Sequence, residues 1–145
     1  METIKNIIEE HFPNSIEAFE EVFGKPTFTV KASDIVKICR FLKENPDLYF
    51  DYLMSLTAVE WPDRFDVVYH LYSIEKKHFL TLKIKTDKEN CEVPSVTSVW
   101  NAANWQEREV FDMFGIRFDG HPNLKRILLE PTWEGFPLRK DYVEQ

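Results

Sequence analysis

The sequence changes character at Gly115, and this change constrains the fold more than any other feature. Residues 105–114 have a helical pattern that Gly115 ends, as glycine commonly does just after a helix. The residues that follow have no clear periodicity and are predicted to be extended and irregular. About 30 residues of this kind cannot build a core alone, so we expect them to lie on a surface of this domain or of a partner. They contain Pro122, Pro131, Pro137, Gly120 and Gly135.

The part of the chain before Gly115 carries the patterns from which a core can be built. The chain has 145 residues, of which 43% are hydrophobic, and this fits one domain. Residues 65–74 and 77–85 are predicted to be the two strands of a hairpin, with one solvated face on the second strand. One register places the apolar residues of both strands on the same face. It pairs Leu80 with Leu71, Leu82 with Tyr69, and Ile84 with Val67.

Other elements follow from periodicity and from boundary signals. Residues 2–23 predict one or two short helices, interrupted at Pro13. A helix with Ser33 as its N-cap should end before Asn45-Pro46. The remaining segments are a short strand at 27–30, a segment at 50–61 that is ambiguous but favours a strand, and a helical segment opened by Pro94-Ser95.

These elements predict an α+β fold, a two-layer domain with helices packed on a small mixed or antiparallel sheet. We place this domain at residues 1–114 and a long extended C-terminal docking tail at residues 115–145. Truncation after Phe114 is expected to leave the isolated fold largely intact. Cys39 falls on the apolar side of a predicted helix, and we expect no disulfide between Cys39 and Cys91.

Several classes of function are disfavoured by the composition. A formal charge of −7 argues against nucleic acid as a partner, because phosphate binding needs clustered Lys and Arg. No apolar run approaches the roughly 20 residues of a membrane span, and the N-terminus has no export signal. The four glycines form no phosphate-binding motif, two separated cysteines cannot supply an iron–sulfur cluster, and no metal site is expected.

Residues 107–126 combine acidic, basic and aromatic side chains at unusual density. On a helix, Arg108 and Asp112 are neighbours, as are Glu109 and Asp112. The aromatic residues among them leave little room for a purely solvated face, and buried charges are tolerated only when paired. We therefore interpret Glu107, Arg108, Glu109 and Asp112 as a charged network that fixes the turn into the tail. The expected partners of its carboxylates are Arg117, Arg126 and Arg139.

Other interpretations of this segment stay open. The charges could form a solvated helix face with ion-pair energies of about 0.3 to 0.5 kcal/mol each. Paired carboxylates could mark a glycoside hydrolase, although neighbours on one short helix form no cleft. A stand-alone enzyme would use Glu107, Glu109, Asp112 and His121 as acids and bases, although a lone histidine such as His121 is more often structural.

The segment EREVFDMFGIRFDGHPNLKR at residues 107–126, with Asn104-Trp105 before it and residues 137–142 after it, resembles the C-terminal signature of a known family. This is the 30 kDa subunit family, also called the C subunit family, of respiratory NADH:quinone oxidoreductase (complex I). Asn123 and Phe136 depart from the usual pattern, which has an acidic residue and a histidine there. The residues that we assign to a partner interface or structural signature are Glu107, Arg108, Glu109, Asp112, Gly115, His121, Pro122, Arg126, Trp133, Arg139 and Tyr142.

The resemblance implies a non-catalytic hydrophilic subunit of a proton-translocating complex, with no cofactor of its own. It would brace a neighbouring large subunit, of the 49-kilodalton type, near the quinone-reducing end of the iron–sulfur chain. Iron–sulfur clusters, FMN and quinone would belong to partner subunits, at the cytoplasmic side of the cell membrane. The tail would wrap the large subunit, with Trp133, Phe136 and Tyr142 as anchors.

The same module could instead serve a related complex, and the sequence does not identify the electron donor. The alternatives are a membrane-bound hydrogenase with nickel–iron on a partner, a formate hydrogenlyase, or a dehydrogenase using ferredoxin or another donor. A stand-alone adaptor domain with a peptide-like docking tail is a further alternative.

Overall fold

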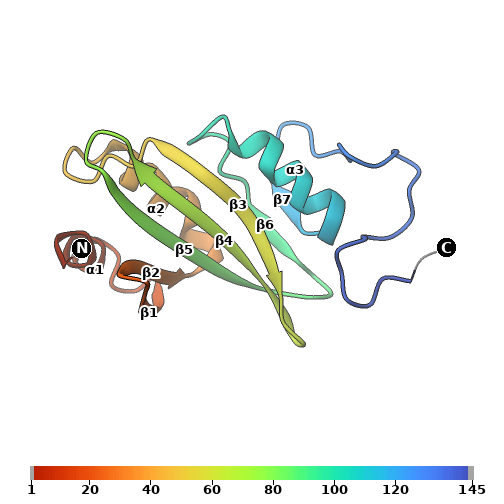
Figure 1. Ribbon diagram of the computed structural model, residues 1–145, viewed down its shortest axis with the longest axis horizontal. Helices are drawn as coiled ribbons and strands as arrows, with labels where there is room; N and C mark the ends of the chain where they lie inside the picture. The colour runs from red at the N-terminus through yellow and green to blue at the C-terminus, as the bar shows by residue number, and fades with distance from the viewer. Residues whose placement is uncertain (1, 144–145) are drawn as a thin grey trace.

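A five-stranded mixed sheet forms the centre of the structure (Figure 1). The computed structural model describes residues 2–143, so residues 1, 144 and 145 of the predicted ranges lie outside the described residues. The strand order is β1-β2-β5-β4-β3, with β2 and β5 parallel, and β6 and β7 form a separate parallel pair. The predicted α+β fold is confirmed. The elements are α1 (Glu2–His11), β1 (Ile16–Val22), β2 (Lys25–Val30), α2 (Ile35–Glu44), β3 (Tyr52–Glu60), β4 (Arg64–Ser73), β5 (His78–Asp87), β6 (Glu92–Pro94), α3 (Ala103–Phe114) and β7 (Arg117–Asp119).

The helices are distributed unevenly around this sheet. In Figure 1, α2 lies behind the strands, and β5, β4 and β3 face the viewer with no described helix in front of them. α3 packs along the edge strand β3, where Gln106 accepts a hydrogen bond from Leu56 N–H and donates one to Leu53 O (3.5 Å). These bonds cover backbone groups that an edge strand would otherwise expose. Apolar side chains of α1, α2, α3 and the inward face of the strands form one core.

Most elements agree with the patterns in the sequence. The β4–β5 register is the predicted one, with Leu80 opposite Leu71, Leu82 opposite Tyr69, and Ile84 opposite Val67. The ambiguous segment at 50–61 is the strand β3, and the short strand at 27–30 lies within β2. α2 ends at Glu44, and Asn45 before Pro46 has an extended backbone, as expected of a residue that precedes proline.

The helix predicted for the second half of residues 2–23 is wrong, because residues 16–22 form β1. The helical appearance has a structural cause, since the register of β1 shifts between Ile16 and Ala18 where it pairs with β2. This bulge inserts a residue, so that Ile16 and Phe19, three residues apart, both pack against the core. A strand with a bulge therefore mimics helical spacing.

Two predicted helix starts are also wrong. α2 begins after a 3-10 turn at Ala32–Asp34, and Asp34 rather than Ser33 precedes its first residue. The Asp34 carboxylate accepts a hydrogen bond from Ser15 Oγ (2.7 Å) and does not cap the helix. Pro94 ends β6 instead of opening a helix, and Ser95 N–H donates to Asp119 O (2.7 Å).

The first residues after Gly115 belong to the packed domain. β7 pairs with β6, and Ile116 and Phe118 are fully buried in the core. The predicted boundary between residues 114 and 115 thus falls inside packed structure. The expectation that truncation after Phe114 would leave the fold intact conflicts with this burial. From residue 120 to residue 143 the described chain contains turns and bends without helix or strand.

Candidate docking site at the end of the third helix

Asp112, in the last turn of α3, organises the first part of the tail. Its side chain is fully buried, and Oδ1 accepts a hydrogen bond from Arg126 Nη1 (2.7 Å). Its other oxygen, Oδ2, accepts three backbone N–H groups of the tail, from Ile127 (3.1 Å), Leu128 (2.7 Å) and Leu129 (3.0 Å). A carboxylate near the negative end of a helix dipole needs such donors. The tail is therefore folded around this side chain.

These donors determine the protonation of Asp112. Burial by itself would raise the pKa of the carboxyl group. The hydrogen bonds from Arg126 and from the N–H groups of Leu128, Leu129 and Ile127 outweigh burial, so the pKa lies below its ordinary value of 3.8. Asp112 is therefore a fixed negative charge at neutral pH, which suits a structural role better than proton transfer.

Arg126 connects Asp112 to a second point of the tail. Its Nη1 also donates to Asp112 O (2.8 Å), and its Nη2 donates to Gly135 O (2.5 Å). The guanidinium lies 4.9 Å from the centroid of the Phe136 ring. We call Asp112, Arg126, Gly115 and Phe136 the tail hub.

Gly115 serves this hub in two ways. Its backbone is left-handed, with φ +78°, which ends α3 by the predicted glycine cap. The ring of Phe136 lies so close that an added Cβ would be 2.6 Å from Phe136 Cε2. Only glycine therefore allows both the turn and the approach of the ring.

Further along, the tail returns to the C-terminal end of α3. Leu138 N–H donates to Met113 O (3.0 Å), and Arg139 Nε donates to Phe114 O (2.5 Å). These are carbonyl groups that a helix end leaves without a helical partner. Lys140 N–H donates to Glu60 Oε1 (2.6 Å), so the tail is also fastened to the sheet.

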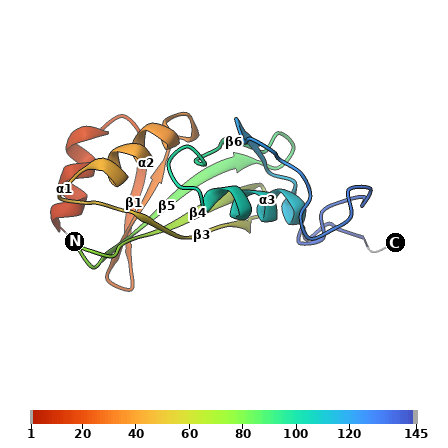
Figure 2. The same cartoon turned by 90° about the horizontal axis from the view of Figure 1, so that it is seen from above.

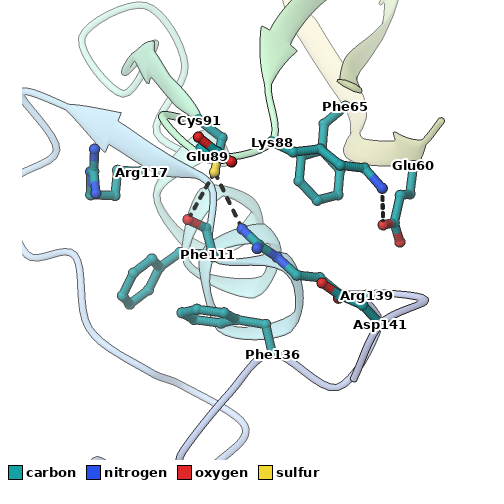
Figure 3. A pocket seen from close by; sticks show the side chains of 11 residues that line it. Glu60, Phe65, Lys88, Glu89, Cys91, Phe111, Arg117, Phe136, Arg139 and Asp141 are labelled. Atoms are coloured by element: carbon teal, nitrogen blue, oxygen red, sulfur yellow. Dashed lines mark hydrogen bonds and ion pairs between the residues drawn. The ribbon is translucent and has the colours of Figure 1, made fainter. Parts of the chain in front are cut away.

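A hollow of about 600 Å³ lies between the tail and the body of the domain (Figure 3). Arg139 crosses it, with its guanidinium 5.1 Å from the ring of Phe65 and 5.3 Å from that of Phe136. Its Nη2 lies 3.4 Å from Cys91 Sγ, and among the described residues no carboxylate pairs with it. Lys88 and Glu60, on the opposite wall, form an ion pair (2.5 Å).

Glu107 does not belong to the tail hub. Its side chain is fully buried and accepts hydrogen bonds from Ser95 Oγ (2.6 Å) and Val96 N–H (2.8 Å). Burial raises the pKa to about 7, and these two donors only partly offset it. Glu107 thus fixes the loop between β6 and α3.

The other acidic and basic residues of the signature occupy separate places. Glu109 accepts from Trp105 Nε1 (2.8 Å). Arg108 donates to Lys125 O and Arg126 O, and not to Asp112 as the helical spacing suggested. His121 Nε2 lies 3.1 Å from Asn104 O, while its Nδ1 accepts Asn123 N–H (2.9 Å), so this ring joins the tail to the start of α3.

The predicted network is therefore confirmed only at Asp112 and Arg126. Of the other two arginines, Arg117 lies 3.5 Å from Glu92 and donates to Asn90 Oδ1 (3.1 Å), while Arg139 binds a carbonyl and a thiol. Sequence reasoning missed Glu60, Cys91 and the contact of Phe136 with Gly115. For Glu60 a signal existed, since it falls on the inward side of a strand that alternates between buried and exposed residues.

The arrangement offers no convergent acid and base. Glu107, Glu109, Asp112 and His121 each have a different partner, so the stand-alone enzyme has no support in this geometry. The described residues include no group of three or more His, Cys, Asp or Glu that could hold a metal ion. None of the helices that the structure describes is long and apolar enough to cross a membrane.

The remaining members of the signature lie on the outside of the tail. Pro122 is exposed, and 42% of Trp133 is exposed. Tyr142 packs over Gly135, where an added Cβ would lie 3.0 Å from Tyr142 Cε2. Trp133 is thus the predicted anchor whose side chain remains available to a partner.

Comparison with solved structures places this fold among components of respiratory membrane complexes. The chain superimposes on the trypsin-resistant fragment of Nqo5 with a TM-score of 0.72 and 26% identity, covering 86% of this chain and all of that one. It also matches a chain of the membrane-bound sulfane sulfur reductase, an archaeal respiratory membrane complex, with a TM-score of 0.75 and 28% identity, over 98% of this chain and 85% of that one.

Sequence comparison identifies the family. The family model of the respiratory-chain NADH dehydrogenase 30 Kd subunit matches residues 28–145. The C 2 subunit of NADH-quinone oxidoreductase from Rhizobium meliloti is 46% identical over 134 residues, which are 90% of this chain and 73% of that protein. The C subunit of the same enzyme from Geobacter sulfurreducens is 45% identical over 142 residues, or 95% and 86%. The chain belongs to the 30 Kd subunit family, which confirms the resemblance in residues 107–126.

Proposed function

We propose that this chain is a non-catalytic subunit of a proton-translocating NADH:quinone oxidoreductase, and that its tail docks it onto the large subunit near the quinone-reducing end of the iron–sulfur chain. The observation that carries the proposal is a tail that is fixed in shape and yet displays apolar side chains. Leu128 is 57% exposed, Trp133 42%, Leu138 56% and Val143 78%. Apolar and aromatic side chains held on a surface mark protein interfaces.

The tail hub explains how an irregular segment could bind tightly. A flexible tail loses conformational entropy when a partner orders it, and this loss weakens binding. Asp112 and Arg126 order the segment before the partner arrives, and Arg139 fastens its last turn to α3. Because Phe136 is engaged inside the hub, Trp133 and Leu138 are the anchors that we assign to the partner.

The chemistry of electron transfer would belong to other chains. Each acidic residue of the signature helix is bound to a structural partner within this domain. We therefore assign the iron–sulfur clusters, FMN and quinone to partner subunits, with this chain as a peripheral part at the cytoplasmic side of the cell membrane.

A second candidate is the same structural role in a related complex with a different electron donor or acceptor. The likeness to a chain of the sulfane sulfur reductase complex favours it, because that match covers 98% of this chain. A hydrogenase, formate hydrogenlyase or ferredoxin-dependent complex would use the domain in the same way.

Affinity isolation of the tagged chain from native membranes tests the proposal. We expect it to bring down the large subunit together with a nicotinamide-binding flavin subunit. A nickel–iron subunit in place of the flavin subunit would select the second candidate. The double variant Trp133→Ser, Leu138→Ser should lose these partners.

The matched control is Phe23→Ser, which removes a side chain that is 97% exposed in the β1–β2 turn, away from the tail (Figure 2). It should co-isolate like the unchanged protein. Equal recovery of the large subunit with the tail variant and the control would refute docking through the tail.

A further inference from the structure

The face of the sheet that no described helix covers carries a row of aromatic rings. Tyr52, Tyr72 and Phe79 are direct neighbours across β3, β4 and β5. The rings of Tyr72 and Phe79 lie 4.4 Å apart, and Lys25 Nζ of β2 lies 4.2 Å from the Phe79 ring. Tyr52 is 46% exposed. The row is therefore an apolar strip on open sheet with a cation at one end.

The same face is positively charged beyond this row. Lys83 and Lys85 follow Phe79 along β5 at alternate positions, so they point to the same side. The acidic residues of this face already have partners, since Glu20 pairs with Lys83 (3.4 Å) and Asp66 with Arg64 (2.9 Å).

Among the described residues no carboxylate pairs with Lys25 or Lys85. The face thus has an excess of positive charge, although the whole chain has a net charge of −7. Charge that opposes the sign of the whole molecule and surrounds exposed rings indicates a surface suited to an acidic partner.

We propose that Tyr52, Tyr72, Phe79, Lys25, Lys83 and Lys85, called here the open-face patch, form a second docking surface that binds an acidic segment of a neighbouring protein subunit. Carboxylates of that segment meet Lys25 and Lys85, and an apolar side chain lies on the ring row. The proposal rests on the proposed function, because it requires an assembly that supplies the neighbour. It adds a contact on the side of the domain away from the tail hub.

A protein segment suits this patch better than nucleic acid. A phosphate backbone needs several cations in line to release its counterions. Here Lys83 is neutralised by Glu20, and the far end of the face holds Arg64 between Asp63 and Asp66. The two remaining lysines beside a ring row match a short acidic and apolar peptide instead.

Lysine acetylation with an N-hydroxysuccinimide ester, read by mass spectrometry, tests the patch. The isolated full chain is compared with the chain in its native membrane complex. We expect the reactivity of Lys25 and Lys85 to fall about tenfold or more on assembly, because a docked carboxylate excludes the reagent. Lys37 on α2, with 65% of its side chain exposed, is the internal reference. Unchanged reactivity of Lys25 and Lys85 in the assembled complex would overturn the proposal.

Carbodiimide coupling of the same complex identifies the occupant, because it joins a lysine directly to a carboxylate in contact with it. We expect isopeptide bonds from Lys25 or Lys85 to Asp or Glu of another subunit. Protection that disappears after nuclease treatment would overturn the proposal in favour of nucleic acid. Lys25→Glu and Lys85→Glu, which break no ion pair among the described residues, should weaken co-isolation, while Lys37→Glu should not.

The tail provides an independent reading of the proposed function. A complex that assembles through the tail while Lys25 and Lys85 stay reactive would refute the open-face patch alone. A chain that brings down no respiratory subunit at all would refute the proposed function.

Discussion

Replacing Asp112 by asparagine removes the charge at the centre of the tail hub and keeps the size of the side chain. The asparagine carbonyl can still accept the N–H groups of Ile127, Leu128 and Leu129. Its amide group, however, faces the Arg126 guanidinium, whose side chain is only 9% exposed. Arg126 then lies partly buried without a counter-ion.

The expected loss follows from these contacts. A charge-assisted hydrogen bond contributes about 1.5 to 3 kcal/mol, and breaking a buried ion pair from one side costs about 3 to 5 kcal/mol. Because the backbone bonds survive in part, we expect the lower end, about 3 kcal/mol. This corresponds to roughly a hundredfold larger open population of the tail.

Hydrogen exchange measures this opening directly, because the amides of Ile127, Leu128 and Leu129 donate to Asp112. At neutral pH these amides should exchange roughly a hundredfold faster in Asp112→Asn. The folded pKa of Asp112 is depressed, so its stabilisation is complete above 3.8 and is lost as the pH falls through the lowered pKa. The two proteins should therefore converge in acid.

The control is Glu109→Gln on the same helix, which loses one exposed hydrogen bond from Trp105. It should change the exchange of Ile127, Leu128 and Leu129 by less than about threefold, as expected for a surface charge. If Asp112→Asn behaves like this control, or if its effect is the same at pH 7 and pH 3, the hub does not hold the tail.

Three further predictions concern stability, measured by urea unfolding. Gly115→Ala should cost more than Gly24→Ala by about 1 to 3 kcal/mol, since both have positive φ but only Gly115 touches a ring. The raised pKa of Glu107 means that stability falls by about 3 kcal/mol as the pH rises from 4.5 to 7, and Glu107→Gln should remove that dependence. Truncation after Phe114 should unfold the domain because Ile116 and Phe118 are lost from the core, whereas truncation after Asp119 should leave it cooperative in its unfolding.

The sequence predicts the parts of the fold that depend on local patterns. The β4–β5 register follows from alternation, because a slip of one residue would turn every apolar side chain to the other face. The end of α3 follows from Gly115, whose left-handed backbone suits glycine. By contrast, the pattern of β1 predicts a helix, since a bulge moves its apolar residues to a helical spacing.

The contacts of the candidate site depend on distant residues and were predictable only in part. Charge pairing indicated Asp112 with Arg126, but nothing local distinguishes the buried Glu107 from the half-exposed Glu109 two residues later. That difference arises because Ser95 and Val96 fold over one carboxylate and not the other. Likewise β7 is too short to show a pattern, and it forms because β6 offers a free edge.

Docking through the tail is tested most directly by a photoreactive phenylalanine analogue placed at position 133 in native membranes. We predict that illumination joins this position to the large subunit, because Trp133 is held outward by the tail hub. The same analogue at position 23, in the β1–β2 turn, should not give this product. A complex that assembles normally but gives no crosslink from position 133 to the large subunit would contradict docking through the tail.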